Sequence, residues 1–350
     1  MPLVVQAPKP GLDLPAWAAD NRDLIDARVL DHRAVLFRGF DVKTAAVFHA
    51  FVNATSHGPL LEYKDRSTPR YEVGDGIYVS TIYPSDQRIH PHNEGTYWKT
   101  WPLKIYFCCL KAATRGGETP IADVRNVYNR LDPDVRRRFE KKHVMYVRNY
   151  NRGVGLPWQE AFQTSDRAVV DEYGAQNGIS MEWASDGRLR TRQVRPAVRI
   201  HPATGERVWF NHAAFFHVTS LDPLVQEALL GSYGEEGLPY NTYFGDGSPI
   251  PADVVSHIRE AYAAEKQMFP WQQDDVLLLD NMSMAHAREP YAGERNVVVA
   301  MTEAQSDARP GRQSRVAGSG LKAQGLGPES PARSRRLERG HANQGLSPKP

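Results

Sequence analysis

The sequence predicts a mainly β fold, in which a sandwich or barrel of strands carries helices packed against its outside. Two observations favour this class: the expected strands outnumber the expected helices, and long loops rich in glycine and proline separate them. A succession of short strands with few helices is typical of sandwich and barrel architectures. Because long loops in a compact domain are often functional, we expect site residues on these loops.

The first third of the chain alternates helices with strands. A helix is expected over 13–32, then a strand over 34–40 that ends at a glycine turn, and then a second helix over 43–55. Residues 76–83 and 103–112 are rich in β-branched and aromatic side chains, which fit the pleated surface of a sheet. These two segments are therefore expected to be strands.

The rest of the chain, up to about residue 305, continues this pattern. Asp123 is a suitable N-cap for a short helix over 124–131, and Pro133 can begin the next helix in its first turn. Further elements are expected as helices over 222–232 and 251–266, and as strands over 143–148, 195–200, 207–211, 275–280 and 296–302.

The composition is that of an ordinary globular protein, with 41% hydrophobic and 24% charged residues in a chain of 350. The net charge of +2 gives no reason to expect nucleic acid as a partner. No segment approaches the run of about 18 apolar residues that spans a membrane, and the first residues lack the pattern of a secretory signal. We therefore expect a cytoplasmic protein with no membrane segment.

Residues 306–350 differ from the rest of the chain. They contain nine Lys or Arg against three Asp or Glu, and they contain no Phe, Trp or Tyr. Such a segment cannot bury enough apolar surface to offset the entropy lost on ordering it. We predict a single folded domain over 1–305, followed by a disordered basic tail over 306–350.

The cysteines, Cys108 and Cys109, are neighbours within the apolar run "IYFCCLKA". A disulfide between adjacent residues is strained, and two thiols cannot form a disulfide framework. The plain interpretation is a buried strand in a protein of a reducing compartment.

A candidate metal site lies in "RIHPHNEGTYW". His92 and Glu94 are two residues apart at the end of a strand region, and at that spacing both side chains project to one face. His90 shares this parity and is a rival ligand. The chain contains 12 histidines, so a His-x-Glu pattern alone does not separate a metal site from chance.

A third ligand is available in "DVLLLDNMSMAHAREP". Here a buried strand over 275–280 leads into a loop that carries His286, and Asp280 and Asn281 are placed to shape the turn that aims it. Two histidines and one carboxylate with open positions form the ligand set of non-haem Fe(II) oxygenases.

A candidate anion anchor follows the third ligand. Arg295 begins an apolar strand, on a face continued by Val297 and Val299, and a guanidinium there needs an anionic partner. Arginine binds a carboxylate through two parallel hydrogen bonds, as a 2-oxoacid cosubstrate would require. The hydroxyl of Thr119, in "RGGETPIADV", could give that carboxylate a further hydrogen bond.

Together these segments and several others resemble the TauD/TfdA family of Fe(II)- and 2-oxoglutarate-dependent dioxygenases over roughly residues 20–303. Within that family the chain is most similar to a branch of peptide-antibiotic biosynthesis, the syringomycin-pathway aspartyl hydroxylase type, with clavaminate synthase more distant. The resemblance rests on "HPHNEGTYW", "GGETPIADVRNVYNRL", "VRNYNRGVGLPWQEAF", "HPATGERVWFNHAAFFH", "LPYNTYFGDGSPI" and "LLLDNMSMAHAREPYAGERNVVVAM".

The resemblance implies a double-stranded β-helix, the cupin-like jelly roll, with a metal inside its open mouth. It implies that His92, Glu94 and His286 bind Fe(II), that Thr119 and Arg295 bind 2-oxoglutarate, and that O₂ is the oxidant. Arg288, two residues after His286, could be a second carboxylate contact or a surface charge.

The chain departs from the family pattern at two positions. Most of the wider family has Asp as the middle ligand, whereas Glu94 fits the antibiotic branch. Relatives in that branch commonly have "FNQAHLFH" where this chain has "FNHAAFFH", so His212 replaces an expected amide. The second departure bears on the identity of the substrate rather than on the class of reaction.

The expected reaction is hydroxylation of an unactivated C–H bond, in an amino acid or in an aminoacyl group held on a peptidyl carrier protein. Halogenation would need the carboxylate position vacant, and Glu94 fills it. Desaturation and cyclisation use the same ligands and stay open. A cupin-like metal protein without oxygenase activity, such as a zinc hydrolase, is the alternative class, but it would have no use for both Arg295 and Thr119.

Candidate substrate contacts are Tyr97, Trp98, Arg148, Asn149, Asn211, His212 and His217. The two aromatic residues follow the metal motif closely, although core packing would produce the same pattern. Residues 148–159 combine Arg, Asn and Gly, which is typical of a lid over a substrate and also of a plain surface loop. Asn211 fits a pocket wall or a turn equally well.

Overall fold

The computed structural model describes residues 1–307, apart from residues 10, 64, 69–70, 75, 81–82 and 152. Residues Met1–Asp307 form one compact unit. From residue 308 onward, the predicted basic tail lies outside the described residues.

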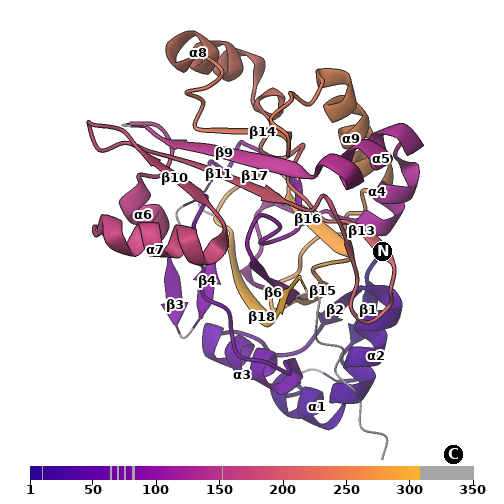
Figure 1. Ribbon diagram of the computed structural model, residues 1–350. Coiled ribbons are helices and arrows are strands. Elements are labelled where there is room, and N and C mark those ends of the chain that lie inside the picture. Colours follow the sequence, from indigo (N-terminus) through magenta and orange to yellow (C-terminus); the bar gives the residue numbers. More distant parts are fainter. Residues whose placement is uncertain are drawn as a thin grey trace, which may run out of the picture. The chain divides into compact units, whose positions relative to one another are not determined.

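A seven-stranded sheet forms the base of this unit (Figure 1). Each pair of neighbouring strands is antiparallel except for the first pair, which is parallel. In spatial order the strands are β1 (Leu3–Gln6), β2 (Ala34–Arg38), β15 (Val276–Asp280), β6 (Thr100–Lys111), β18 (Asn296–Ser306), β4 (Ile77–Val79) and β3 (Glu72–Gly74).

The central strands of this sheet are apolar over most of their length, and both of their faces are covered. On β15, Leu277 and Leu279 belong to the core that lies between the sheets, whereas Val276 and Leu278 belong to the core beneath the helices. Alternate residues of a strand point to opposite faces. The unbroken runs that predicted β6, β15 and β18 are therefore the sign of a sheet buried on both sides.

Three helices cover the outer face of this sheet: α1 (Leu14–Asp20), α2 (Arg22–His32) and α3 (Ala45–Thr55). The single helix predicted over 13–32 is wrong in one respect, because it breaks at Asn21. The backbone of Asn21 is not helical, and its side-chain amide donates to the carbonyl of Trp17 and so closes the first helix. The side chain of Thr44 caps α3 by accepting from the amide of Val47.

A second sheet faces the first across the larger core cluster (Figure 1). Its strands are β10 (Ser180–Trp183), β11 (Leu189–Arg195), β9 (Val144–Tyr150) and β14 (Tyr240–Phe244), and all are antiparallel. The strand predicted over 195–200 corresponds to a shorter element, β12 (Val198–Ile200), which pairs with β13 (Arg207–Trp209), while residue 195 ends β11.

Two further small sheets complete the β structure. One has the order β5 (Ile89–His92), β16 (Met284–Arg288) and β8 (Ile121–Asp123). The other pairs β17 (Tyr291–Ala292) with β7 (Arg115–Gly116). Two facing sheets with helices outside them make the mainly β architecture that the sequence predicts, and the three-stranded sheet carries the candidate metal ligands.

The remaining helices lie in the segments that connect the strands of the second sheet to one another and to the rest of the domain. They are α4 (Val124–Arg130), α5 (Pro133–Lys142), α6 (Trp158–Phe162), α7 (Arg167–Asn177), the 3₁₀ turn η1 (Val218–Ser220), α8 (Pro223–Tyr233) and α9 (Ala252–Glu265). The helix starts predicted at Asp123 and Pro133 are confirmed, since the Asp123 carboxylate accepts from the amide of Arg125 and Pro133 occupies the first turn of α5.

The two cysteines lie in the second half of β6, are unpaired, and are wholly buried. The buried-strand interpretation is thus confirmed. Burial raises the pKa of Cys109 to about 12 and also raises that of Cys108.

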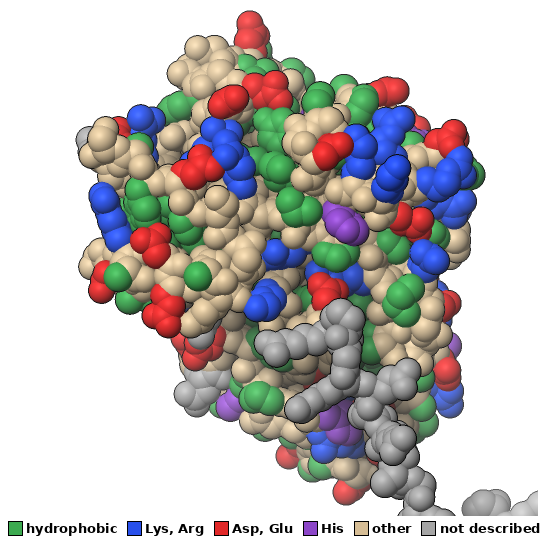
Figure 2. Space-filling model, viewed as in Figure 1, with side chains coloured by type: hydrophobic (Ala, Val, Ile, Leu, Met, Phe, Trp, Pro, Cys, Tyr) green, Lys and Arg blue, Asp and Glu red, His purple; other side chains and the backbone are tan. Residues whose placement is uncertain are grey.

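Over the face shown in Figure 2, Lys and Arg side chains are interspersed with Asp and Glu. Among the described residues, the structure has no helix that is both long enough and apolar enough to cross a membrane.

Candidate active site

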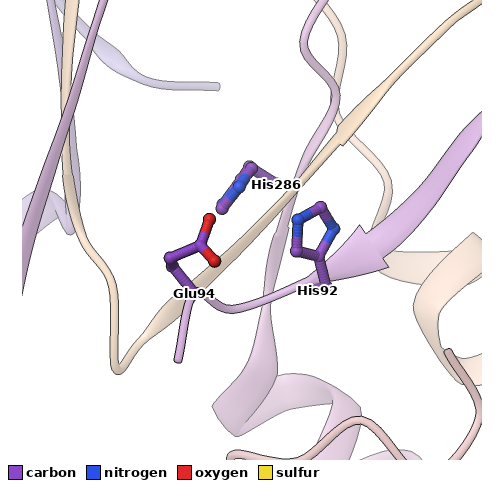
Figure 3. Close-up of side chains that lie close together, drawn as sticks. All are labelled: His92, Glu94 and His286. Atoms are coloured by element: carbon purple, nitrogen blue, oxygen red, sulfur yellow. The ribbon is translucent and has the colours of Figure 1, made fainter. Parts of the chain in front are cut away.

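Three candidate ligands converge at the small sheet (Figure 3). His92 is the last residue of β5, Glu94 lies in the turn that follows, and His286 lies on β16. The strands β5 and β16 are antiparallel neighbours, and their register sets His286 directly opposite His92. One ligand atom from each side chain lies within 4.8 Å of the others, and all three side chains are buried.

The prediction that His286 lies on a loop is wrong, because it sits within the central strand of the sheet. The sequence does place a turn before it. The Asp280 carboxylate accepts from the amides of Met282 and Ser283 and from the Ser283 hydroxyl, and so caps the turn. A strand pairing on both sides fixes the imidazole of His286 more firmly than a loop could.

The side chain of Asn281 joins this turn to the other ligand segment. Its amide oxygen accepts from the backbone of Glu94 at 2.8 Å, and its amide nitrogen donates to the carbonyl of Glu94 at 3.0 Å. In return, the Asn93 side chain donates to the Asn281 carbonyl at 2.7 Å. The two ligand segments, almost 190 positions apart in sequence, are held in register by these reciprocal amide contacts.

Two hydrogen bonds orient the ligand side chains themselves. Nδ1 of His92 lies 2.8 Å from the carbonyl of His90, a contact in which the ring nitrogen donates, so that Nε2 is the atom that can bind a metal. The phenol of Tyr63 donates to Oε2 of Glu94 at 2.7 Å. His90, the rival ligand, contributes its backbone carbonyl, and its ring is outside the group that converges in the described part of the chain.

This donor set fits Fe(II). Two imidazoles and one carboxylate, buried and converging on one point, are the ligands that Fe(II) oxygenases use, and they leave positions open for other molecules. A carboxylate buried in this way needs positive charge nearby, and a divalent cation would supply it.

A narrow cavity of about 30 Å³ adjoins the ligands, with both His92 and His286 in its wall. At its other side Arg295 donates through Nε to the carbonyl of Gly117 at 2.9 Å. Its two terminal nitrogens lie near hydroxyls, 3.4 Å from Ser80 Oγ and 3.5 Å from Thr119 Oγ1. The indole of Trp271 donates to the same Thr119 oxygen at 3.0 Å, so the hydroxyl proton of Thr119 can point to a ligand.

A second guanidinium, that of Arg288, lines the same cavity. It is buried rather than on the surface, which removes the surface-charge alternative, and it donates to the carbonyls of Tyr83, Pro84 and Gln87. Burial, and then the charge of Arg288, lower the pKa of Arg295 to about 10. Neither guanidinium forms an ion pair with a carboxylate of the described residues, so a bound anion would relieve both unfavourable effects.

A wide cavity of about 310 Å³ opens on the other side of His92. Its wall includes His92, Glu94 and His212. Nε2 of His212 lies 2.8 Å from the carbonyl of Asn93, and the hydroxyl of Tyr146 donates to the backbone of His212. Burial, followed by the proximity of His92, holds the pKa of His212 well below its usual range, so this imidazole is neutral.

Three of the other candidate substrate residues, Trp98, Asn211 and Asn149, do not line this cavity. Trp98 packs edge-on against Tyr63 at 5.7 Å, behind the metal ligands. The Asn211 amide donates to the carbonyl of Ala197, as a turn-forming residue would. Asn149 donates to two carbonyls of the 236–238 segment.

Tyr97 and Arg148 line a separate small cavity of about 20 Å³. The guanidinium of Arg148 pairs with Asp65 at 3.2 Å and lies between the rings of Tyr150 and Tyr240, at 4.2 and 4.9 Å from their centres. This cluster supports the loop that carries Tyr63. His217, and Val154 and Gly155 from the candidate lid, do line the wide cavity.

Three contributors to the site escaped the sequence reasoning: Tyr63, Ser80 and Trp271. Each reaches the site from a segment without a recognisable motif, and each acts through one hydrogen bond. Ser80 falls within the strand predicted over 76–83, of which β4 is the part that forms, so its position near an element end was the available signal.

The fold and this site define a double-stranded β-helix enzyme of the kind that binds a metal in its mouth. The model of the taurine catabolism dioxygenase TauD, TfdA family matches residues 2–302, and the chain therefore belongs to that family. It is a 2-oxoglutarate-dependent dioxygenase, which works with Fe(II) and O₂. Membership excludes the alternative of a cupin-like metal protein without oxygenase activity.

Particular relatives agree with this assignment. The chain is 41% identical over 279 residues to the dapdiamide synthesis protein DdaC of Enterobacter agglomerans, covering 80% of this chain and 84% of the relative. It is 30% identical over 308 residues to a clavaminate synthase-like protein of Arabidopsis thaliana, covering 84% and 89%. The crystal structure of PvcB from Pseudomonas aeruginosa shares the fold, with a TM-score of 0.51, 14% identity and coverage of 85% and 84%.

Proposed function

We propose that this dioxygenase hydroxylates an unactivated C–H bond of an amino acid, or of an aminoacyl group held on a peptidyl carrier protein, in the synthesis of a peptide natural product. The observation that carries the reaction type is Glu94, which fills the carboxylate position of the triad and leaves no place there for a halide. The natural-product setting is supported by the relative named for dapdiamide synthesis.

In this proposal His92, Glu94 and His286 hold the iron. Bound Fe(II), together with 2-oxoglutarate and O₂, supplies the oxidant, and 2-oxoglutarate leaves as succinate and CO₂. The chain itself orients the two imidazoles through strand pairing, keeps the Glu94 carboxylate in place through the phenol of Tyr63, and excludes bulk water by burying all three side chains.

Arg295 and Thr119 hold the distal carboxylate of 2-oxoglutarate. The forked guanidinium of Arg295 and the Thr119 hydroxyl lie on the same cavity wall, so the two groups can bind one carboxylate together. Arg288 adds a second positive charge while its own hydrogen bonds secure the segment 83–87.

The outcome at the substrate could also be desaturation or cyclisation, because these reactions use the same ligands. The proposal further includes a lid over 148–159, which Val154 and Gly155 support by lining the wide cavity. It includes a folded domain over 1–305, followed by a disordered tail. It also includes a cytoplasmic location, which the two unpaired cysteines support.

The test is a turnover assay of the purified full chain with Fe(II), 2-oxoglutarate and O₂. Succinate should form slowly without substrate and faster with the right one, and mass spectrometry should find 16 mass units added to the product, the mass of the one oxygen atom that hydroxylation inserts. The assay offers amino acids both free and as thioesters on a carrier protein. An absence of succinate under every condition would contradict the proposal.

A further inference from the structure

The wall of the wide cavity is mainly apolar. Beyond the metal ligands it is built from Phe215, Phe216, Val218, Leu229 and Leu238. These side chains come from the connection between β13 and β14, including η1 and α8. Figure 2 shows hydrophobic side chains at the surface near α8, the helix that contributes Leu229 to this wall.

The charged groups of the described lining are few and already engaged. Arg88 is about half exposed and binds Glu289 through two nitrogens, at 2.9 and 3.1 Å. Glu94 accepts from Tyr63 and is a candidate metal ligand. Arg259 does not line the cavity, because it lies behind the wall and donates to the hydroxyls of η1.

His217 is the imidazole of this wall that lies away from the ligands in sequence. Burial, and then the charge of Arg259, lower its pKa to about 4, so it is uncharged at neutral pH. The narrow cavity differs, because it is lined by the buried guanidinium of Arg288 and the partly buried guanidinium of Arg295, and neither forms an ion pair with a carboxylate of the described residues. A carboxylate inserted into the wide cavity would find no such partner and would lose its hydration.

We propose that the group this enzyme oxidises is uncharged and mainly aliphatic or aromatic, with any carboxylate or ammonium kept at the rim or masked as an amide or thioester. This inference rests on the proposed function. It excludes a side chain such as that of aspartate, which the syringomycin-type resemblance would suggest. The volume of about 310 Å³ suits a group at the small end of the range for organic ligands.

The helix α8 offers a matched pair of positions for a test. None of its residues is fully buried, so a substitution on it does not disturb the core. Leu229 lines the cavity, whereas Leu224, on the same helix, is 77% exposed and lies outside it. Leu229→Glu brings a carboxylate to the cavity wall, and Leu224→Glu brings the same charge to the outer surface.

The experiment measures binding of two probes to the protein loaded with Fe(II) and 2-oxoglutarate, without O₂, by calorimetry. The probes are N-acetyl-leucine methylamide and N-acetyl-aspartate methylamide, which differ in the charge of the side chain. The leucine derivative should bind at least about tenfold more tightly, because the aspartate carboxylate would be desolvated without a partner. Leu229→Glu should lower its affinity by about tenfold, and Leu224→Glu should leave it unchanged.

Equal or tighter binding of the aspartate derivative, or an equal effect of the two Glu variants, would overturn the inference. Succinate formation from 2-oxoglutarate without any probe is measured in parallel. If that activity is present, failure of the probe test counts against the uncharged substrate alone. If succinate forms under none of the conditions of the turnover assay, the proposed function has failed as well.

Discussion

The two cavities that share His92 have opposite characters. The narrow one is walled mainly by strands β5, β6 and β16, and it contains the buried guanidinium of Arg288 and the partly buried guanidinium of Arg295, which lies just before β18. The wide one shares β5 but is otherwise walled mainly by connecting segments, η1 and α8, and is mainly apolar. Charges held on or directly beside paired strands suit a ligand that never changes, such as a cosubstrate. Apolar side chains on connections can be exchanged without loss of the sheet, so the wide cavity is where substrate choice can vary.

The largest expected effect comes from the ligands at the boundary between the cavities. His92→Ala or His286→Ala should abolish succinate formation and greatly weaken Fe(II) binding, because two remaining ligands do not hold the metal. Turnover and Fe(II) titration measure this. His90→Ala is the control and should keep most of the activity, since its backbone carbonyl remains. A fully active His92→Ala protein would remove the triad from this account.

The next effect separates the cavities by comparing two arginines. Arg295→Ala should weaken 2-oxoglutarate binding by about 2–5 kcal/mol, because the distal carboxylate loses its partner in a buried site. Arg295→Lys should restore only part of this, since an ammonium cannot form the paired hydrogen bonds. Arg88→Ala, at the rim of the wide cavity, should leave the 2-oxoglutarate titration unchanged. If the two alanine variants behave alike, the cavities have been assigned wrongly.

A smaller effect is expected from the hydrogen bond that supports Glu94. Tyr63→Phe should weaken Fe(II) binding by about tenfold, as is typical when a partner of a metal ligand is lost. The matched control is Tyr128→Phe, which removes a bond of the same length, 2.7 Å, to the carboxylate of Glu140 far from the site. Fe(II) titration of both variants measures the difference in metal affinity between them. A loss of affinity shared by both would point to general destabilisation.

The smallest effect is expected from the tail, which belongs to neither cavity. A chain ending after Asp307 should keep its melting temperature and its 2-oxoglutarate turnover. The cut must leave β18 whole, because this strand pairs with β6 through Ser306, and Asp307 pairs with Arg199 at 3.0 Å. A chain ending at Met301 is the comparison and should melt several degrees lower.

A large loss of stability on truncation after Asp307 would contradict the prediction of a disordered tail. If stability and basal turnover persist while activity on a carrier-bound substrate alone is lost, the tail is a docking segment for an acidic carrier protein.

The sequence predicted the apolar strands and the convergence of the triad, and it missed elements whose pattern is polar. The strand β11 has the sequence "LRTRQVR", and its buried face carries Thr191, Gln193 and Arg195 as well as Leu189. Hydrophobic alternation therefore gave no signal there. The strand β16 has the sequence "MAHAR", in which small or polar residues prevail, so its pattern carries no strand signal although all five residues are buried.

Side-chain direction was the harder part of the site. Trp98 and Asn211 follow motifs that line a pocket, yet both turn into the protein, Trp98 against Tyr63 and Asn211 toward Ala197. The spacing of residues along the chain predicts where a strand or a turn lies. It does not predict which face of that segment lines the cavity, because this depends on how the second sheet packs. Arg295 could be predicted because a charge at the start of an apolar strand needs a partner, whereas His212 was noticed because it replaces the amide expected from the family resemblance.

The adjacent thiols of β6 have a practical consequence for an enzyme that handles oxygen. Thiolate is the form of cysteine that oxidants and alkylating reagents attack, and burial keeps both groups protonated. Their strand is held between β15 and β18, the strands that precede His286 and follow Arg295. Cys108 and Cys109 should therefore resist labelling as long as the central sheet persists, and their modification would record the opening of the sheet itself.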